Sequence, residues 1–145
     1  MTRKTETRSG CPVSLSLDIW GDRWSLLIVR DLMFFDKHTY GEFLESPEKI
    51  ATNILADRLL RLEETGLIRK DEYPGSKSKY FYRLTAKGID LLPMMVEAEL
   101  WYDRHHALKE DFRKTIQQAK RNRTAFLKSM TRKLKNVRAP KGARD

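Results

Sequence analysis

Residues 40–84 of the chain read YGEFLESPEKIATNILADRLLRLEETGLIRKDEYPGSKSKYFYRL. Just before them, Thr39 has the spacing of a capping box with Glu42, in which two side chains satisfy free amides at a helix start. A short helix is therefore predicted near Tyr40–Glu45. Ser46-Pro47-Glu48 predicts a turn after it, because proline disfavours helical angles in the residue that precedes it.

Ile50–Thr65 has the most regular helical pattern in the chain. At about 100° per residue, one face of this helix is apolar and is formed by Leu55, Leu59 and Leu62. The opposite face carries Asn53, Asp57 and Leu60, with Lys49, Ala56 and Arg61 toward its flanks. Gly66 ends the helix as a predicted left-handed C-cap.

Two segments with strand composition, Leu67–Tyr73 and Lys79–Leu84, follow this helix. Tyr73-Pro74-Gly75-Ser76 between them suits a type II turn, so the pair is predicted to form a hairpin. A short helix, a turn, a longer helix and a hairpin form the order of a winged helix-turn-helix, whose second helix enters the DNA major groove. Domains with this order that bind only proteins also exist, and that alternative stays open.

The flanking sequence predicts further helices, which makes the fold mainly α with a small β-hairpin (α+β). Val13–Trp20 has helical spacing and is closed by Gly21, and Asp22 is a good N-cap for a second helix. After the hairpin, Thr85 is predicted to cap one long helix through roughly His105. This helix is apolar on more than one side, which indicates a terminal dimerisation helix. The predicted dimer contacts are Leu91, Leu92, Met95, Val96, Leu100 and Trp101.

The size of the chain, 145 residues, suits one domain with an apolar core. We expect a flexible segment at residues 1–10, a DNA-binding and dimerisation domain at 11–108, and a basic, partly helical extension at 109–145 that is disordered from Ala139. No apolar run approaches the roughly 20 residues that a membrane span needs, and no secretory signal is present. The sequence therefore predicts a cytoplasmic protein without a membrane partner.

The net charge of +9 is unevenly distributed. Residues 1–108 contain 16 basic and 17 acidic side chains, whereas residues 109–145 contain 13 basic and 3 acidic ones. Net charge is therefore no evidence that the folded part binds DNA. The extension has two interpretations: Lys109–Val137 forms a basic amphipathic helix that joins the dimer interface and clamps flanking DNA, or it is a solvated extension that raises only nonspecific affinity.

An enzyme is the least supported function class. The three histidines, His38, His105 and His106, lack the spacing of a metalloprotease site, and neither a phosphate-binding loop nor a serine nucleophile elbow is present. Cys11 is the only cysteine, which excludes an intramolecular disulfide and a cysteine-based zinc site within one chain. The sequence thus predicts no catalytic residues, metal or cofactor.

Several motifs in order and spacing resemble the HxlR-type family of bacterial transcription regulators, which belongs to the MarR-like superfamily. The resemblance covers about Cys11–His105. It rests on Cys11-Pro12-Val13, Gly21-Asp22-Arg23-Trp24, Tyr40-Gly41-Glu42-Phe43, Leu59–Ile68, Tyr73-Pro74 and Tyr82–Gly88. It implies a homodimer of winged-helix subunits that binds a palindromic operator and acts as a repressor or an activator. A nonspecific DNA-binding protein remains an alternative.

Three positions depart from the family pattern. Ala51 stands where the family commonly has a serine N-cap, so we expect Thr52 or Ser46 to cap the helix instead. Leu60 occupies an outward position that is often polar. The tip of the wing, residues 75–79, is rich in serine and lysine rather than proline.

Base contacts are predicted for Thr52, Asn53, Ala56 and Asp57, because amide, methyl and carboxylate groups suit adenine, thymine and cytosine edges in the major groove. Asp57 has a structural alternative, an ion pair with Arg61 four positions on. The other predicted DNA contacts are basic and are directed to phosphates: Lys49, Arg58, Arg61, Lys77 and Lys79. For Arg58 and Arg61, a bond to a carboxylate of the chain itself is the alternative. For Lys77 and Lys79, it is a role in solubility alone.

Cys11 matches the position of a cysteine that senses oxidants or electrophiles in several HxlR-type regulators. A sensing thiol must be exposed and must have a lowered pKa, which Arg8 or a helix N-terminus could supply. The alternative is a small buried residue at the start of the first helix.

Overall fold

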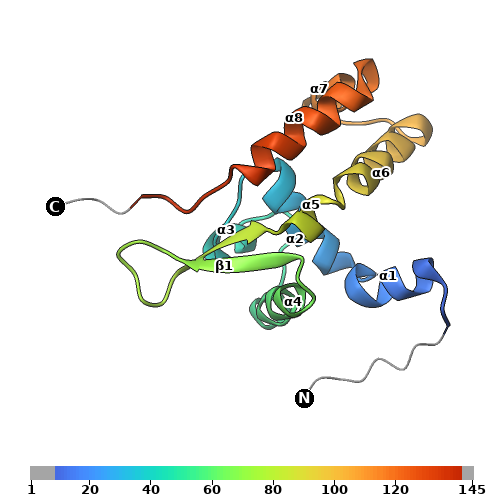
Figure 1. Ribbon diagram of the computed structural model, residues 1–145. Helices are drawn as coiled ribbons and strands as arrows, with labels where there is room; N and C mark the ends of the chain where they lie inside the picture. The colour runs from blue at the N-terminus through green and yellow to red at the C-terminus, as the bar shows by residue number, and fades with distance from the viewer. Residues whose placement is uncertain (1–8, 142–145) are drawn as a thin grey trace.

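A two-stranded hairpin lies between α4 on one side and α8 on the other in the computed structural model, which describes residues 9–141 (Figure 1). The elements run in the order α1 (Pro12–Trp20), α2 (Arg23–Phe34), α3 (Tyr40–Leu44), α4 (Thr52–Glu64), β1 (Ile68–Glu72), β2 (Tyr80–Leu84), α5 (Ala86–Ile89), α6 (Leu92–His105), α7 (Glu110–Arg121) and α8 (Arg123–Lys135). The predicted winged helix-turn-helix and its fold class are confirmed. Most of the predicted flexible N-terminus, residues 1–8, lies outside the described residues.

The first two helices meet at a tight turn that requires glycine. A Cβ on Gly21 would lie 2.3 Å from the backbone oxygen of Leu17, so no larger residue fits without moving the backbone. Asp22 then caps α2, as predicted, by accepting hydrogen bonds of 3.0 Å from the amides of Trp24 and Ser25. Asp22, the residue directly before the helix, was therefore enough to predict where α2 begins.

One of the two hydrogen bonds of the predicted capping box of α3 is present, and the other is made by a different amide. The amide of Glu42 donates to Oγ1 of Thr39 at 3.3 Å. The Glu42 carboxylate, however, accepts from the amide of His38 at 3.2 Å and from the Thr39 hydroxyl at 2.9 Å, rather than from the Thr39 amide. The box therefore closes one residue earlier than its standard form.

α4 begins without a side-chain cap, so the prediction that Thr52 or Ser46 takes this role is wrong. Ser46 is buried and bonds to Asp31 and Lys37 instead. At the other end, Gly66 has φ of +80°, which confirms the left-handed conformation predicted for it.

β1 and β2 pair antiparallel, with Ile68 opposite Leu84 and Glu72 opposite Tyr80. The predicted type II turn is confirmed by a hydrogen bond of 3.1 Å from the Ser76 amide to the Tyr73 oxygen and by φ of +80° at Gly75.

The single helix predicted from Thr85 to His105 is wrong. Thr85 caps only the short α5, and α6 starts anew at Leu92. Pro93 is the physical reason, because it has no amide hydrogen to donate and its ring would clash with the Ile89 carbonyl of a continuous helix.

The basic extension folds as two helices rather than one. Asn122 separates the two helices, because its φ of −155° is extended rather than helical. Its side-chain oxygen caps α8 by accepting a hydrogen bond from the amide of Ala125 at 3.0 Å. α8 packs against α5, α6 and α7. Ala119 of α7 and Leu134 of α8 belong to the hydrophobic core cluster, so at least this part of the extension is not a solvated tail.

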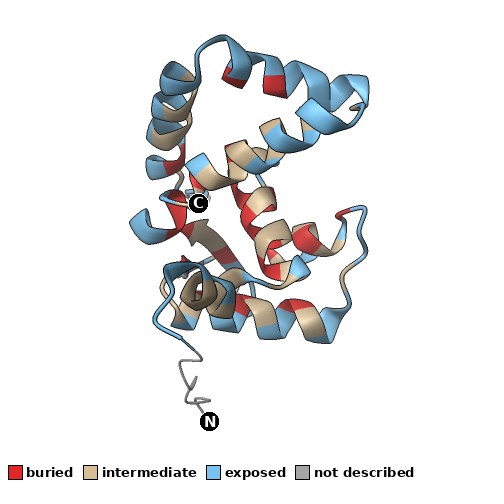
Figure 2. Ribbon diagram, turned by 90° about the vertical axis from the view of Figure 1, so that its right-hand side faces the viewer, coloured by how far each residue is buried: buried red, intermediate tan, exposed pale blue. Residues whose placement is uncertain are grey.

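The core lies where α2, α4, α6 and the hairpin meet, and Figure 2 shows that the buried residues lie on the parts of these elements that face one another. The predicted apolar face of α4 is confirmed, since Leu55, Leu59 and Leu62 are at most 3% exposed. Burial of this face fixes which side of α4 remains free. Among residues 9–141, no helix is long and apolar enough to cross a membrane.

Candidate nucleic-acid interface

α4, the second helix of the helix-turn-helix, exposes the side opposite its leucines. Thr52, Asn53, Ala56 and Asp57 lie in its first two turns and are all exposed. Together they form a surface of small and polar side chains at the helix N-terminus. Such a surface is compatible with close approach to base edges.

Arg58 is held by carboxylates of its own chain. Its Nε donates to Asp22 at 2.9 Å, and a second nitrogen pairs with Asp57. The hydrogen bond to Asp22 is the largest of the effects that raise the pKa of Arg58. The alternative considered for Asp57, an ion pair with Arg61, does not form, because Asp57 pairs with Arg58 instead. Arg58 thus orients α4 against the start of α2.

Basic side chains flank the exposed face of α4. Arg61 is exposed one turn further along the helix, and Lys49 is exposed in the preceding turn, where its φ is +55°. That turn is linked to α3, because the Tyr40 hydroxyl donates to the Thr52 oxygen at 2.9 Å. Leu60, the apolar departure from the family pattern, is 55% exposed.

The wing carries the two predicted phosphate contacts, Lys77 and Lys79, and both are exposed. Lys79 also lies 4.1 Å from the centre of the Tyr73 ring, which orients it across the hairpin. The base of the wing is braced by Arg83, whose Nε donates to Asp71 on the opposite strand at 2.7 Å. The lysines therefore project from a fixed support.

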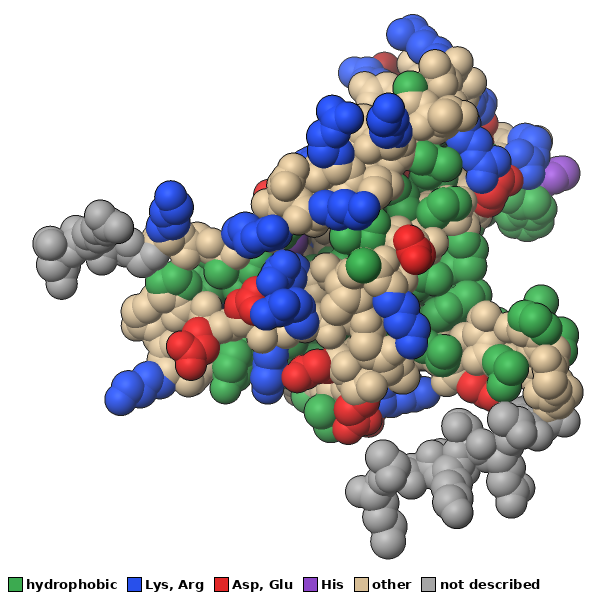
Figure 3. Space-filling model, in the orientation of Figure 1, with side chains coloured by type: hydrophobic (Ala, Val, Ile, Leu, Met, Phe, Trp, Pro, Cys, Tyr) green, Lys and Arg blue, Asp and Glu red, His purple; other side chains and the backbone are tan. Residues whose placement is uncertain are grey.

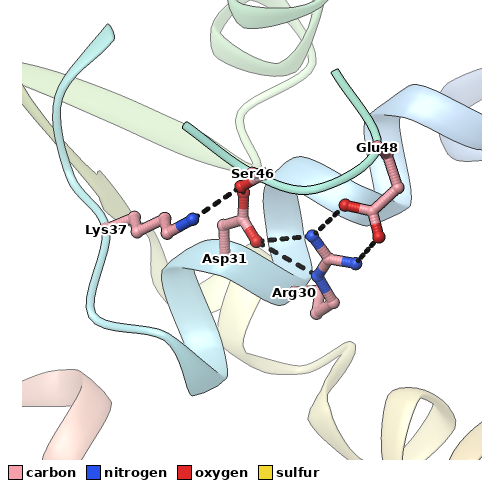
Figure 4. A network of polar contacts seen from close by, with 5 residues as sticks. All are labelled: Arg30, Asp31, Lys37, Ser46 and Glu48. Carbon is pink, nitrogen blue, oxygen red and sulfur yellow. Dashed lines mark hydrogen bonds and ion pairs between the residues drawn. The ribbon is translucent and has the colours of Figure 1, made fainter. Parts of the chain in front are cut away.

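A polar network around the buried Asp31 and Ser46 fixes the turn between α3 and α4, and sequence reasoning missed it (Figure 4). Ser46 donates to the buried Asp31 at 2.5 Å and accepts from Lys37 at 2.7 Å. Arg30 bridges Asp31 at 2.8 Å and Glu48 at 2.7 and 2.8 Å. The hydrogen bond from Arg30 lowers the pKa of Glu48. The only available signal, Ser46-Pro47-Glu48, indicated a turn but not these partners.

His38 has a structural role. Its ring stacks on Phe81 at 4.5 Å between centroids, and its Nδ1 lies 2.9 Å from the oxygen of Tyr82. The amide of Tyr82 in turn donates to the His38 oxygen at 2.7 Å. These bonds attach the loop before α3 to β2.

Cys11 is the N-cap of α1 and its thiol is exposed. The nearby backbone amides of Ser14 and then Val13, at the start of α1, lower the pKa of the thiol below its usual value. An exposed thiol with a lowered pKa has the two properties that reactivity needs. Arg8, the other expected cause, lies outside the described residues.

Residues 19–110 match the model of the HxlR-like helix-turn-helix family. The chain belongs to this family. It is therefore a transcription regulator of the helix-turn-helix type, as predicted. α7 and α8 lie almost entirely outside the matched residues.

Solved structures of HxlR-like relatives agree with this assignment. The sequence of PA1607 is 40% identical to this chain, and its crystal structure is similar with a TM-score of 0.59 over 72% of this chain and 71% of that one. The transcriptional regulator YodB of Bacillus subtilis is 32% identical over 64% of this chain and 83% of its own. Its reduced form is similar with a TM-score of 0.55 over 67% of this chain and 95% of that one. The redox regulator HypR in its reduced form is 26% identical, with a TM-score of 0.58 over 65% of this chain and 92% of that one.

The predicted dimer contacts of this HxlR-like chain fall into two groups. Leu92 and Val96 are 0% and 1% exposed and pack inside their own subunit. Leu91, Met95 and Leu100 are partly buried, whereas Trp101 is 54% exposed. Sequence reasoning missed the exposed apolar residues Val13, Leu17 and Tyr102. Figure 3 shows apolar side chains gathered between α6 and α1.

Within residues 9–141, no group of three or more His, Cys, Asp or Glu side chains is placed to hold a metal ion.

Proposed function

We propose that this chain binds a palindromic operator as a homodimer and controls transcription in response to the state of Cys11. The observation that carries the proposal is the exposed start of α4, with Thr52, Asn53 and Ala56, beside a braced wing that presents Lys77 and Lys79. Small polar groups that can read bases lie next to charges that can hold phosphates.

Dimerisation is supported by the apolar residues that a single subunit leaves exposed. Val13 and Leu17 of α1 are 67% and 51% exposed, and Trp101 and Tyr102 of α6 are 54% and 47% exposed. Contiguous apolar surface of this kind marks an interface. Two subunits joined through α1 and α6 would present two copies of α4 to grooves about 34 to 36 Å apart.

The response to oxidants and electrophiles is supported by the exposure and the lowered pKa of Cys11. The thiolate would add to a quinone with formation of one carbon–sulfur bond, and the quinone oxygen would take up a proton. With peroxide, the sulfur would be oxidised to a sulfenic acid while the peroxide is reduced to water. YodB has been solved in a reduced form and after diamide treatment, and HypR in reduced and oxidised forms.

Selection of bound duplexes from random DNA, under reducing and oxidising conditions, tests the proposal. We expect a palindromic consensus in the reduced sample and a weaker or altered one after oxidation. Recovery of unrelated sequences in both samples would instead support a protein-binding module or a nonspecific DNA-binding protein.

A further inference from the structure

α8 presents a row of basic side chains that is defined here as the α8 basic stripe: Lys128, Arg132 and Lys135. All three are exposed and recur at helical spacing on the side of α8 away from the core. α8 contains no acidic residue. Within residues 9–141, none of the three forms an ion pair. The stripe is therefore a positively charged surface that no acidic side chain of α8 neutralises.

The stripe is held in a fixed place by the packing beneath it. Leu134 is 6% exposed, and Phe126, Leu127 and Met130 pack against the hydrophobic core. Two ion pairs, Arg123 with Glu97 and Lys120 with Asp103, attach the α7–α8 hairpin to α6. A basic amphipathic helix can also bind a membrane through its apolar face, but here that face is buried in protein.

The position of the stripe relative to the helix-turn-helix indicates what it binds. The hairpin lies between α4 and α8, and the chain after α8 runs toward the same side as the tip of the wing (Figure 1). Figure 3 shows lysine and arginine side chains along α8 and over the following segment, on the same face as those of the hairpin. Because the hairpin separates α8 from α4, the stripe can reach only DNA outside the stretch that α4 and the wing would contact.

We propose that the α8 basic stripe binds the sugar–phosphate backbone of DNA that flanks the operator, without reading its sequence. The inference rests on the proposed DNA binding by α4 and the wing. Residues 1–108 carry nearly equal numbers of basic and acidic side chains, so the stripe would add to the attraction for phosphates that the few basic side chains at α4 and the wing supply. Affinity then depends on how far the duplex extends beyond the operator.

The test compares two duplexes, one with the selected operator alone and one with roughly 20 bp, about two helical turns, added at each end. The variant Lys128→Ala/Arg132→Ala/Lys135→Ala removes the stripe, and alanine favours the helix at these exposed positions. The matched control, Lys109→Ala/Lys114→Ala/Arg121→Ala, removes three exposed charges from α7 and its N-cap. Equal unfolding midpoints verify that both variants are folded.

We expect the wild type and the control variant to bind the long duplex more tightly than the short one. The α8 variant should lose this gain and keep wild-type affinity for the short duplex. On the long duplex, its slope of log affinity against log salt concentration should be shallower by about 2 to 3. Equal effects of both variants, or an unchanged length dependence in the α8 variant, would overturn the proposal and leave the stripe to a partner other than DNA.

The same measurements with a scrambled operator separate this inference from the proposed function. If the wild type does not prefer the operator over the scrambled sequence, sequence-specific binding fails. The length dependence on scrambled DNA still decides the role of the stripe.

Discussion

Arg58 of α4 donates a hydrogen bond of 2.9 Å to Asp22, the same carboxylate that caps α2. Asp22 also accepts from the Ser25 hydroxyl at 2.6 Å. One side chain thus caps the start of one helix and, through Arg58, which lies 36 residues later in the sequence, orients another. The position of α4, and of the face that it exposes, therefore depends on Asp22, which is not part of that face.

Asp22→Ala should lower the free energy of unfolding by about 1 to 2 kcal/mol, because it removes an N-cap and leaves Arg58 without this partner. Chemical denaturation measures the change. Asp18→Ala, which removes a carboxylate of α1 that is not a cap, is the matched control and should have a smaller effect. Equal losses in both variants would contradict the role assigned to Asp22.

The contribution of Asp22 should disappear in acid. Burial raises the pKa of the Asp22 carboxyl, but hydrogen bonds from Ser25 and Arg58 outweigh it and hold the pKa at about 2, below the ordinary 3.8. Because the folded-state pKa is the lower one, the stabilisation is complete above about pH 4 and is lost as the pH falls toward 2. The difference in unfolding free energy between wild type and Asp22→Asn should therefore shrink over this range. A difference that is independent of pH would argue against it.

Ser46→Ala should destabilise the protein by about 1 to 3 kcal/mol, since it leaves Oδ2 of the buried Asp31 without the Ser46 donor and Lys37 without this acceptor. Thermal or denaturant unfolding measures this loss. Ser78→Ala, at an exposed position of the wing, provides the comparison and should change stability little. If Ser46→Ala is as stable as Ser78→Ala, the network does not hold the turn.

Helix and turn boundaries were predictable where the deciding group lies within a few residues. Asp22 and Thr39 cap the helices that follow them, and Gly66 and Gly75 adopt the positive φ that their positions require. These effects act through backbone amides and backbone torsion angles close by. They are therefore visible in the sequence itself.

Partners that are distant in the sequence could not be predicted in this way. Arg58 could equally hold a phosphate, and only the tertiary structure brings Asp22 to it. Ser46 was expected to cap α4 because Ala51 is a poor N-cap, and its actual bond to Asp31, 15 residues away, has no periodic signature in the sequence. The break before α6 is different, because Pro93 was visible but the apolar pattern on both sides of it outweighed its effect in the prediction.

Lys77→Ala/Lys79→Ala should weaken binding to all DNA sequences alike, because phosphate contacts carry no sequence information. The slope of log affinity against log salt should become shallower by up to about 2. Asn53→Ala is the contrasting variant, expected to change base preference with little change in slope. Loss of preference with an unchanged slope in the lysine variant would place these side chains elsewhere than on phosphates.

Cys11→Ser should bind DNA like the wild type under reducing conditions and should keep that affinity after treatment with a quinone or peroxide. Serine preserves the size of the N-cap residue but cannot form the reactive thiolate, and the chain has no second cysteine to replace it. Mass spectrometry must first show that Cys11 is modified in the wild type. If DNA binding by the modified wild type is unchanged, Cys11 is a helix-start residue without a sensing role. If Cys11→Ser loses DNA binding after treatment as the wild type does, the reagent acts through another residue.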